Sequence, residues 1–166
     1  MDKTLVIGAN GQIGKLLIQM MTEQKLPVKA MLRKAEQAAE FEKMGAEVVI
    51  ADLEADLPDH AFNDCDKVVF TAGSGGKTGA DKHLIESHLP YTILRPGRLT
   101  DGPLTGTITT TRPTDQEQQF ISRADVAACI LLCLDHSETV NQIEELYQGE
   151  MPIQQAFIKS VKGRLG

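Results

Sequence analysis

The chain has 166 residues, of which 42% are hydrophobic and 24% charged, and its formal net charge is −6 with an isoelectric point near 5.2. This length and composition predict one globular domain over residues 1–166, large enough to bury a substantial core. The acidic balance excludes nucleic acid and an anionic membrane surface as expected partners, because binding to phosphate groups relies on clustered lysine and arginine.

The first residues, "MDKTLVIGAN", lead directly into an apolar strand without the charged and apolar regions of a signal peptide. No apolar run approaches the length of about 20 residues that a membrane-spanning helix needs. We therefore expect a cytoplasmic protein that is not inserted in a membrane.

Strands and helices are expected to alternate along the first half of the chain. The expected strands cover 4–7, 28–33, 46–53 and 67–73, with helices around 13–21 and 35–45 and a short helix within 54–64. Gly45 stands at the C-terminal capping position of the second helix. This alternation predicts an α/β fold, a Rossmann-like doubly wound parallel sheet with right-handed crossovers.

The second half is expected to continue with further strands and helices. Helices are expected at 80–89, 122–135 and 152–162, strands at 91–96 and 144–149, and a small extended piece at 105–111. Ser122 and Asp125 fit a capping box at the start of the 122–135 helix. In the same helix Cys129 and Cys133 are four residues apart in an apolar stretch, which favours small buried side chains over a disulfide or a metal site.

A glycine-rich loop joins the first strand to the first helix. In "GANGQIG", Gly8 allows a tight turn, Gly11 allows a pyrophosphate to approach the backbone, and Gly14 allows close packing of helix and strand. The N-terminus of the helix then offers free N–H groups and a positive dipole end to the phosphates. The spacing and its position between strand and helix predict a dinucleotide-binding loop.

The ends of the next strands supply further candidates. Arg33 and Lys34 end the second strand, where an NAD-preferring site would carry an acidic residue, so we predict NADP as the cofactor, with NAD as the alternative. The alternative for this pair is two solvated charges. Asp52 is placed to accept a hydrogen bond from the adenine amino group, or else serves as a loop or capping residue.

The fourth strand ends in small residues. Thr71, Ala72 and Gly73 would let a cofactor lie across the carboxyl edge of the sheet. The glycine-rich stretch that follows, with Lys77, fits either a second anion-binding loop or a flexible connection.

Six segments of the chain resemble motifs of a known family and occur in the same order as in that family. They are "LVIGANGQIG", "VKAMLRKAEQ", "GAEVVIADLE", "VVFTAGSGGKTGADK", "YTILRPGRLTD" and "FISRADVAACILLCLD". Together they resemble the atypical short-chain dehydrogenase/reductase superfamily, in the branch of NmrA-like proteins, biliverdin-IXβ-type flavin reductases and small bacterial NAD(P)H-binding oxidoreductases that are also called NAD-dependent epimerase/dehydratases.

The resemblance implies a set of cofactor-binding residues. In such proteins the dinucleotide is held at the positions of Gly8, Asn10, Gly11, Gln12, Ile13, Arg33, Asp52 and Leu53. Thr71, Ala72 and Gly73 match the stretch beside the ribose and nicotinamide. Arg95, Pro96 and Gly97 match the turn after a late strand, which borders the nicotinamide and the substrate.

The middle of the chain departs from the family. Relatives continue past "TGADK" with a long helix, a strand that ends in a serine-rich turn, and a helix with Tyr-x-x-x-Lys. Here Tyr91 is followed four residues later by Arg95, and Tyr147 by Met151, so no catalytic set is assigned. A deletion that joined two Asp-Lys sequences would produce this chain, as would an omitted or deliberately removed segment. The shortened sheet is expected in the strand order 3-2-1-4-5, with some apolar surface exposed and self-association, as a homodimer, favoured.

Three functions remain open. The resemblance implies an NAD(P)-binding protein of oxidoreductase type, with hydride transfer to a small acceptor such as a flavin or quinone, which needs mainly proximity. The alternatives are a catalytically silent, NmrA-like dinucleotide sensor and a truncated product whose site is only partly formed. No metal site is expected, since His83 and His88 are five residues apart, a poor helical spacing for a shared ion.

Overall fold

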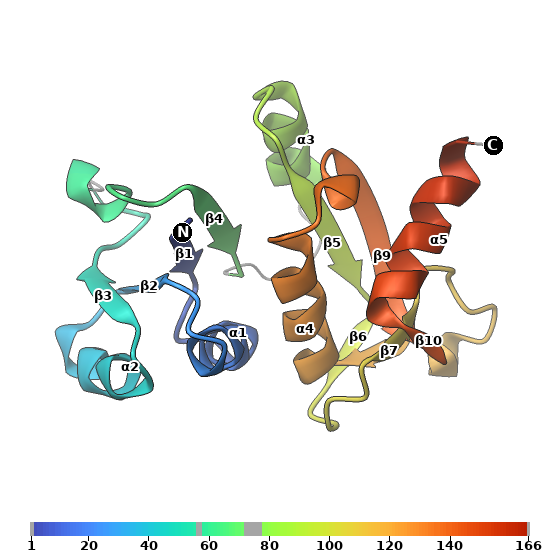
Figure 1. Cartoon of the computed structure of the whole chain (residues 1–166), viewed down its shortest axis with the longest axis horizontal. Coiled ribbons are helices and arrows are strands. Elements are labelled where there is room, and N and C mark those ends of the chain that lie inside the picture. The colour runs from blue at the N-terminus through green and yellow to red at the C-terminus, as the bar shows by residue number, and fades with distance from the viewer. Residues whose placement is uncertain (1, 56–57, 72–77, 166) are drawn as a thin grey trace. The chain divides into compact units, whose positions relative to one another are not determined.

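The computed structural model describes residues 2–55, 58–71 and 78–165, and the chain divides into two compact units, Met1–Gly73 and Ser74–Gly166 (Figure 1). Both units combine strands with helices, and the first contains a parallel sheet, which confirms the predicted α/β, Rossmann-like class. The single-domain organisation expected from the length stays a prediction.

The first unit follows the predicted alternation closely. In chain order its elements are β1 (Thr4–Ile7), α1 (Gln12–Glu23), β2 (Val28–Leu32), the 3-10 helix η1 (Ala35–Gln37), α2 (Ala38–Met44), β3 (Glu47–Ile50), the 3-10 helix η2 (Asp59–Ala61) and β4 (Lys67–Phe70). The four strands are parallel in the order β3-β2-β1-β4. Gly45 ends α2 with φ +94°, a left-handed conformation, as predicted from the capping position.

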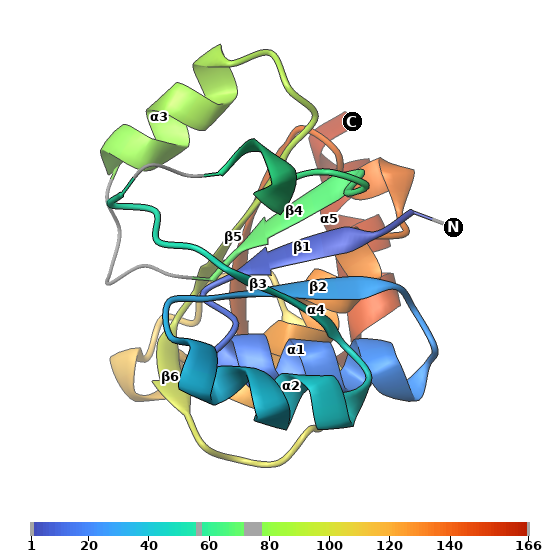
Figure 2. The same ribbon diagram turned by 90° about the vertical axis from the view of Figure 1, so that its left-hand side faces the viewer.

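The two helices of this unit lie side by side against one face of the sheet (Figure 2). Their buried side chains are mainly apolar residues on the sheet-facing sides, namely Leu17, Ile18, Met21 and Phe41. The other face of the sheet carries a cluster in which Ala61 of η2 and Cys65 pack against side chains of the strands. The members of that cluster from the strands and the end of β3 are Leu5, Ile7, Met31, Val49 and Ala51.

This second face is less well covered at β4. Leu5 pairs with Val68 and Ile7 pairs with Phe70, so the paired residues share a face of the parallel ladder. Leu5 and Ile7 are buried, whereas Val68 is 52% and Phe70 61% exposed. The apolar exposure expected from the shortened fold is therefore present on β4, while self-association remains a prediction.

A charged group lies on the same face of the sheet. Lys29 of β2 is only 4% exposed, and its ammonium donates to the carbonyl of Asn63 at 2.9 Å and pairs with Glu47 Oε1 at 3.0 Å. The second oxygen of Glu47 accepts from Lys3 Nζ at 2.7 Å. The hydrogen bonds from Lys3 and Lys29 lower the pKa of the Glu47 carboxyl below its ordinary value of 4.5.

The second unit contains more short elements than the sequence predicts. In chain order they are α3 (Thr78–Glu86), β5 (Thr92–Pro96), β6 (Arg98–Thr100), β7 (Thr107–Thr109), the 3-10 helix η3 (Gln116–Gln118), β8 (Phe120–Ser122), α4 (Arg123–Cys133), the 3-10 helix η4 (Ser137–Thr139), β9 (Gln142–Gln148), β10 (Met151–Pro152) and α5 (Ile153–Leu165). Helix α4 packs against β5 and β8, and α5 packs against β7 and β10.

Strand β5 pairs within the second unit. The predicted order 3-2-1-4-5 holds for its first four strands, and β5 belongs to a sheet of the second unit with the order β10-β7-β9-β5. It pairs in parallel with β9, from Thr92 opposite Gln142 to Pro96 opposite Leu146. This pairing uses one edge of β5, and the predicted place of β5 beside β4 stays a prediction.

The capping box at α4 is present and larger than predicted. Ser122 Oγ accepts from the amide of Asp125 at 3.0 Å and donates to Asp125 Oδ2 at 2.8 Å. The fully buried carboxylate of Asp125 also accepts from the amides of Thr105 and Gly106, at 3.0 and 2.8 Å, and from the Thr105 hydroxyl at 2.9 Å. One aspartate therefore fixes the start of α4 to the loop before β7.

Candidate functional site

The glycine-rich loop between β1 and α1 has the backbone geometry that its spacing predicts. Gly8 adopts φ +82°, and its carbonyl accepts from the amide of Gly11 at 2.9 Å, which closes a tight turn. A Cβ atom on Gly14 would lie 2.5 Å from the carbonyl oxygen of Gly8 and 2.8 Å from that of Ala9. Only a glycine therefore lets the first turn of α1 pack this closely against the loop.

The N-terminus of α1 is left open to a ligand. Gly11 is the N-cap residue, so no side chain caps the helix, and its first turn contains no acidic residue. The residues Asn10, Gly11 and Gln12 are exposed, and Ile13 is half-buried. Free amides at a positive dipole end, in a first turn without an acidic residue, are the features that an anion-binding helix N-terminus needs.

Thr71 holds this loop against the end of β4. Its amide donates to the carbonyl of Ile7 at 2.9 Å, and its hydroxyl lies 3.0 Å from the same oxygen and 3.2 Å from the carbonyl oxygen of Gly8. The sequence suggested only a small residue beside the cofactor, so this positioning contact is a role that the motif did not predict. Ala72, Gly73 and Lys77 of the predicted site lie outside the described residues.

Arg33 and Lys34 follow directly after β2, at the same carboxyl edge of the parallel sheet as the glycine loop. Both side chains are exposed, and Lys34 lies 3.7 Å from Glu36 in a surface ion pair. Across the described ranges, Arg33 has no ion-pair partner. It is therefore available to a ligand phosphate, whereas Lys34 already has a local acidic neighbour.

Asp52 and Leu53 follow the end of β3 at this edge. Asp52 is half-buried, and its Oδ1 accepts from the amide of Glu54 at 3.1 Å, which is a local turn. The loop role that the sequence left open is thus realised, and a role toward adenine stays a prediction. Leu53 is exposed.

The remaining predicted residues lie in the second unit, at the carboxyl end of β5. Arg95, Pro96 and Gly97 line an open pocket of about 580 Å³. The other residues of its lining are Arg98, Arg112, Gln116, Gln119, Glu145 and Tyr147. Gly97 is required here, because a Cβ atom would lie 2.8 Å from Cδ1 of the Tyr147 ring and 2.7 Å from the Gln119 carbonyl oxygen.

A buried tyrosine anchors one side of this pocket. Tyr147 is 3% exposed, and its hydroxyl oxygen accepts from Arg112 Nε at 2.9 Å and donates to Glu145 Oε2 at 3.2 Å. Glu145 also accepts from Arg112 Nη2, and the hydrogen bonds to Glu145 and Tyr147 raise the pKa of the Arg112 guanidinium. Sequence reasoning dismissed Tyr147 for lack of a lysine four residues later. Only the pairing of β7 with β9 brings Arg112 next to it.

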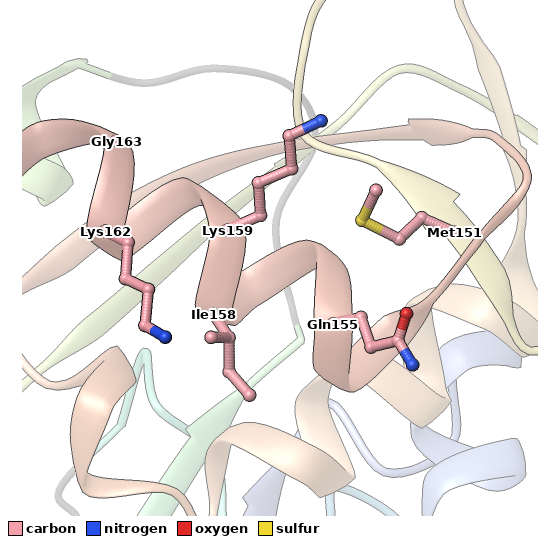
Figure 3. Close-up of a pocket in the computed structure, with 6 residues that line it drawn as sticks. All are labelled: Met151, Gln155, Ile158, Lys159, Lys162 and Gly163. Atoms are coloured by element: carbon pink, nitrogen blue, oxygen red, sulfur yellow. The ribbon is translucent and has the colours of Figure 1, made fainter.

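A second pocket of about 590 Å³ lies along α5 (Figure 3). It is lined by Met151, Gln155, Ile158, Lys159, Lys162 and Gly163. In Figure 3, Met151 approaches from the chain before the helix, and the other labelled residues lie on α5. Neither an acidic nor an aromatic side chain lines this groove, so it offers no acid–base pair.

The cysteines do not form a reactive site. All three are free thiols, and burial raises the pKa of Cys133 to about 11 and the pKa of Cys129 further. Burial also raises the pKa of Cys65. These shifts hold the thiols in the protonated, unreactive form near neutral pH.

The described part of the chain contains neither a metal-binding cluster nor a membrane-spanning helix. Among residues 2–55, 58–71 and 78–165, no group of three or more His, Cys, Asp or Glu side chains is placed to hold a metal ion. In the same ranges, no helix has both the length and the apolar character needed to cross a membrane.

Comparison with known proteins adds relatives along nearly the whole chain. The Bacillus subtilis protein named uncharacterized sugar epimerase YhfK is 34% identical over 214 aligned positions, which cover 95% of this chain and 99% of the relative. A solved structure named as an NAD-dependent epimerase/dehydratase from Bacillus halodurans is 28% identical, with a TM-score of 0.85 over 96% of this chain and all of that one. The oxidoreductase ylbE from Lactococcus lactis shares the fold, with 19% identity and a TM-score of 0.82 over 96% and 97% of the two chains.

The same comparisons agree with a missing internal segment. The alignment to YhfK spans 214 positions while this chain has 166 residues, so the relative contains residues that this chain lacks. The NAD(P)H-binding family matches in two stretches, residues 8–79 and 76–137, which meet at 76–79. That junction coincides with the start of "TGADK", the segment after which the sequence departs from the pattern of the family it resembles. The two stretches together cover most of the chain, and the protein therefore belongs to the NAD(P)H-binding family.

Proposed function

We propose that this chain binds NADP(H) in preference to NAD(H) and transfers hydride between it and a small acceptor such as a flavin or quinone. Dinucleotide binding itself follows from the family. The cofactor preference, the acceptor, a cytoplasmic location and a homodimer are parts of the proposal.

The observation that carries the proposal is the carboxyl edge of the first sheet. The open N-terminus of α1 follows β1, and the exposed guanidinium of Arg33 follows the neighbouring strand β2. Amides of the loop and of the first turn of α1 would hold the pyrophosphate, and Arg33 would pair with a 2′-phosphate on the adenine ribose. An acidic residue in place of Arg33 would instead favour the free ribose hydroxyls of NAD.

The protein's contribution to the chemistry is positioning. When bound, the nicotinamide ring supplies or accepts the hydride. Thr71 keeps the phosphate loop in place through the carbonyls of Ile7 and Gly8, so the cofactor binds to a loop that is already ordered. Hydride transfer between two bound rings needs close approach more than acid–base assistance, which is why the missing Tyr-x-x-x-Lys does not exclude it.

A dinucleotide sensor without turnover is the second candidate. It is favoured by one observation in the sequence, namely that neither Tyr91 nor Tyr147 is followed by lysine at the fourth position. A sensor would bind NADPH and NADP with different affinities and would consume neither.

The test is calorimetric titration with NADPH, NADP, NADH and NAD, together with the variant Arg33→Gln. We expect the phosphorylated forms to bind at least about tenfold more tightly, and Arg33→Gln to remove that difference while leaving NADH binding unchanged. Lys34→Gln is the matched control, because it removes an adjacent charge that already has an acidic neighbour. Equal affinity for NADPH and NADH in the unmodified protein would refute the NADP preference.

Turnover is tested separately, by NADPH oxidation in the presence of flavins and quinones. Consumption of NADPH with one of these acceptors supports the oxidoreductase proposal. Tight binding with no consumption would favour the sensor.

A further inference from the structure

We infer that the open pocket at the carboxyl end of β5 binds the phosphate group of a phosphorylated ligand, and that this ligand is the acceptor. The assignment as acceptor rests on the proposed function, whereas the phosphate site rests on the second unit alone.

Arginine side chains dominate the lining of this pocket. Arg95, Arg98 and Arg112 are three of the six arginines in a chain whose net charge is −6. The lining contains one acidic residue, Glu145, so its formal charge is opposite in sign to that of the protein as a whole. Planar guanidinium groups donate two parallel hydrogen bonds to phosphate oxygens, which makes arginine the preferred residue for such sites.

Two of the three guanidinium groups are held in place by carboxylates. Arg112 uses Nε and Nη2 toward Glu145, and Arg95 Nη2 donates to Asp81 at 2.9 Å. Neither Nη1 atom takes part in these contacts, so each guanidinium keeps donors for a ligand while a carboxylate orients it. Positioned donors lose less freedom when a ligand binds.

Arg98 differs from the other two. In the part of the chain that the structure describes, no carboxylate lies within ion-pairing distance of Arg98. Its backbone is fixed, because its amide donates to the carbonyl of Gln119 at 3.0 Å and the strand β6 pairs with β8. The lining of the pocket thus includes one arginine that no described carboxylate pairs with, and a phosphate would supply a partner for its charge.

The size of the pocket indicates a ligand larger than a free phosphate ion. Its volume of about 580 Å³ lies within the range of roughly 300–1,000 Å³ typical of small-molecule sites. The buried ring of Tyr147 packs directly on Gly97, so this side of the pocket is built on strand residues. The groove along α5 has a similar volume, but its cationic side chains are Lys159 and Lys162, which lack the planar guanidinium group that donates two parallel hydrogen bonds.

The test compares riboflavin with flavin mononucleotide, which carry the same ring system and differ by one phosphate. Binding of each is followed by flavin fluorescence, independently of any turnover, and NADPH affinity is measured on the same samples. The variants are Arg98→Gln and, as a control with the same charge change in the same unit, Lys162→Gln. Both side chains are exposed, so both variants are expected to fold, which circular dichroism will check.

We expect flavin mononucleotide to bind at least about tenfold more tightly than riboflavin. Arg98→Gln should reduce that advantage to about threefold or less, and Lys162→Gln should leave it unchanged. Equal affinity for the two flavins, or an advantage that survives Arg98→Gln, would overturn the inference.

Two further outcomes are also decisive. If neither flavin binds, titration with inorganic phosphate is followed in ¹⁵N-correlated NMR spectra. Shifts at the amides of Gly97 and Arg98 that vanish in Arg98→Gln would support the site, and unchanged spectra would overturn it. If flavin mononucleotide binds more tightly than riboflavin but NADPH does not bind, the phosphate site in the pocket is supported. The assignment of its ligand as the acceptor is then refuted together with the proposed function.

Discussion

Replacing Gly14 with alanine should damage both the stability of the first unit and its affinity for NADPH. The new Cβ atom would lie 2.5 Å from the Gly8 carbonyl oxygen and 2.9 Å from Cα of Ala9, both of which are backbone atoms. Relieving the shortest contact to 3.0 Å requires the loop to move by about 0.5 Å away from α1. That movement also shifts the carbonyls to which Thr71 is bonded.

The expected magnitude follows from two opposing effects. Overpacking of this kind costs about 1–3 kcal/mol, and the higher helix propensity of alanine offsets up to about 1 kcal/mol. The free energy of unfolding should therefore fall by about 1–2 kcal/mol, and the melting temperature by roughly 2–8 °C. Because the proposed pyrophosphate site consists of amides of this loop and of the first turn of α1, NADPH affinity should fall by about tenfold or more.

The control is Gly163→Ala in α5. A Cβ atom at Gly163 would meet nothing within 4 Å, so this substitution should leave stability unchanged or raise it by up to about 1 kcal/mol. Differential scanning calorimetry and NADPH titration on the two variants give the comparison. If Gly14→Ala behaves like Gly163→Ala in both measurements, the close-packing argument for the glycine loop is wrong.

Three other predictions concern stability and reactivity. Asp125→Ala should lower the free energy of unfolding by about 3 kcal/mol or more in urea denaturation, because it leaves buried donors unpaired. The control is Asp115→Ala at an exposed capping residue, which should lower the free energy of unfolding by about 1 kcal/mol or less. Glu47 has a lowered pKa in the folded state, so it adds stability above its unfolded pKa and loses it as the pH falls through the folded value. Thermal melts from pH 6 to pH 3 should therefore fall less steeply for Glu47→Gln, and parallel curves would contradict this ion-pair account. Iodoacetamide at pH 8 should label Cys65 before Cys129, as read by mass spectrometry, because Cys129 is fully buried; early labelling of Cys129 would indicate that α4 opens.

The first unit could be predicted from the sequence because its signals are local. Gly8, Gly11 and Gly14 specify the loop by their spacing, and short apolar runs ended by turn residues locate the four strands within a few residues. Gly45 was predicted as a cap from its position alone. Each of these features depends on backbone conformation or on neighbours close in the chain.

The second unit was harder to predict because its features depend on partners far apart in the sequence. Strands β6, β8 and β10 have only two or three residues and exist through pairing, so they leave little periodicity to detect. The contact of Arg112 with Tyr147 spans 35 residues and follows from the β7–β9 register. Nothing in the residues around Tyr147 indicates this partner.

The boundary between the two units, at Gly73 and Ser74, lies a few residues before the junction of the two family matches at 76–79. The ladders that the structure describes join β1 to β4 in the first unit and β5 to β10 in the second. A change of chain length between the units interrupts none of these ladders, so the position is suited to insertion as well as to loss. The corresponding segment of the Bacillus subtilis relative, placed between the two units, would give a chimaera that tests which activities that segment carries.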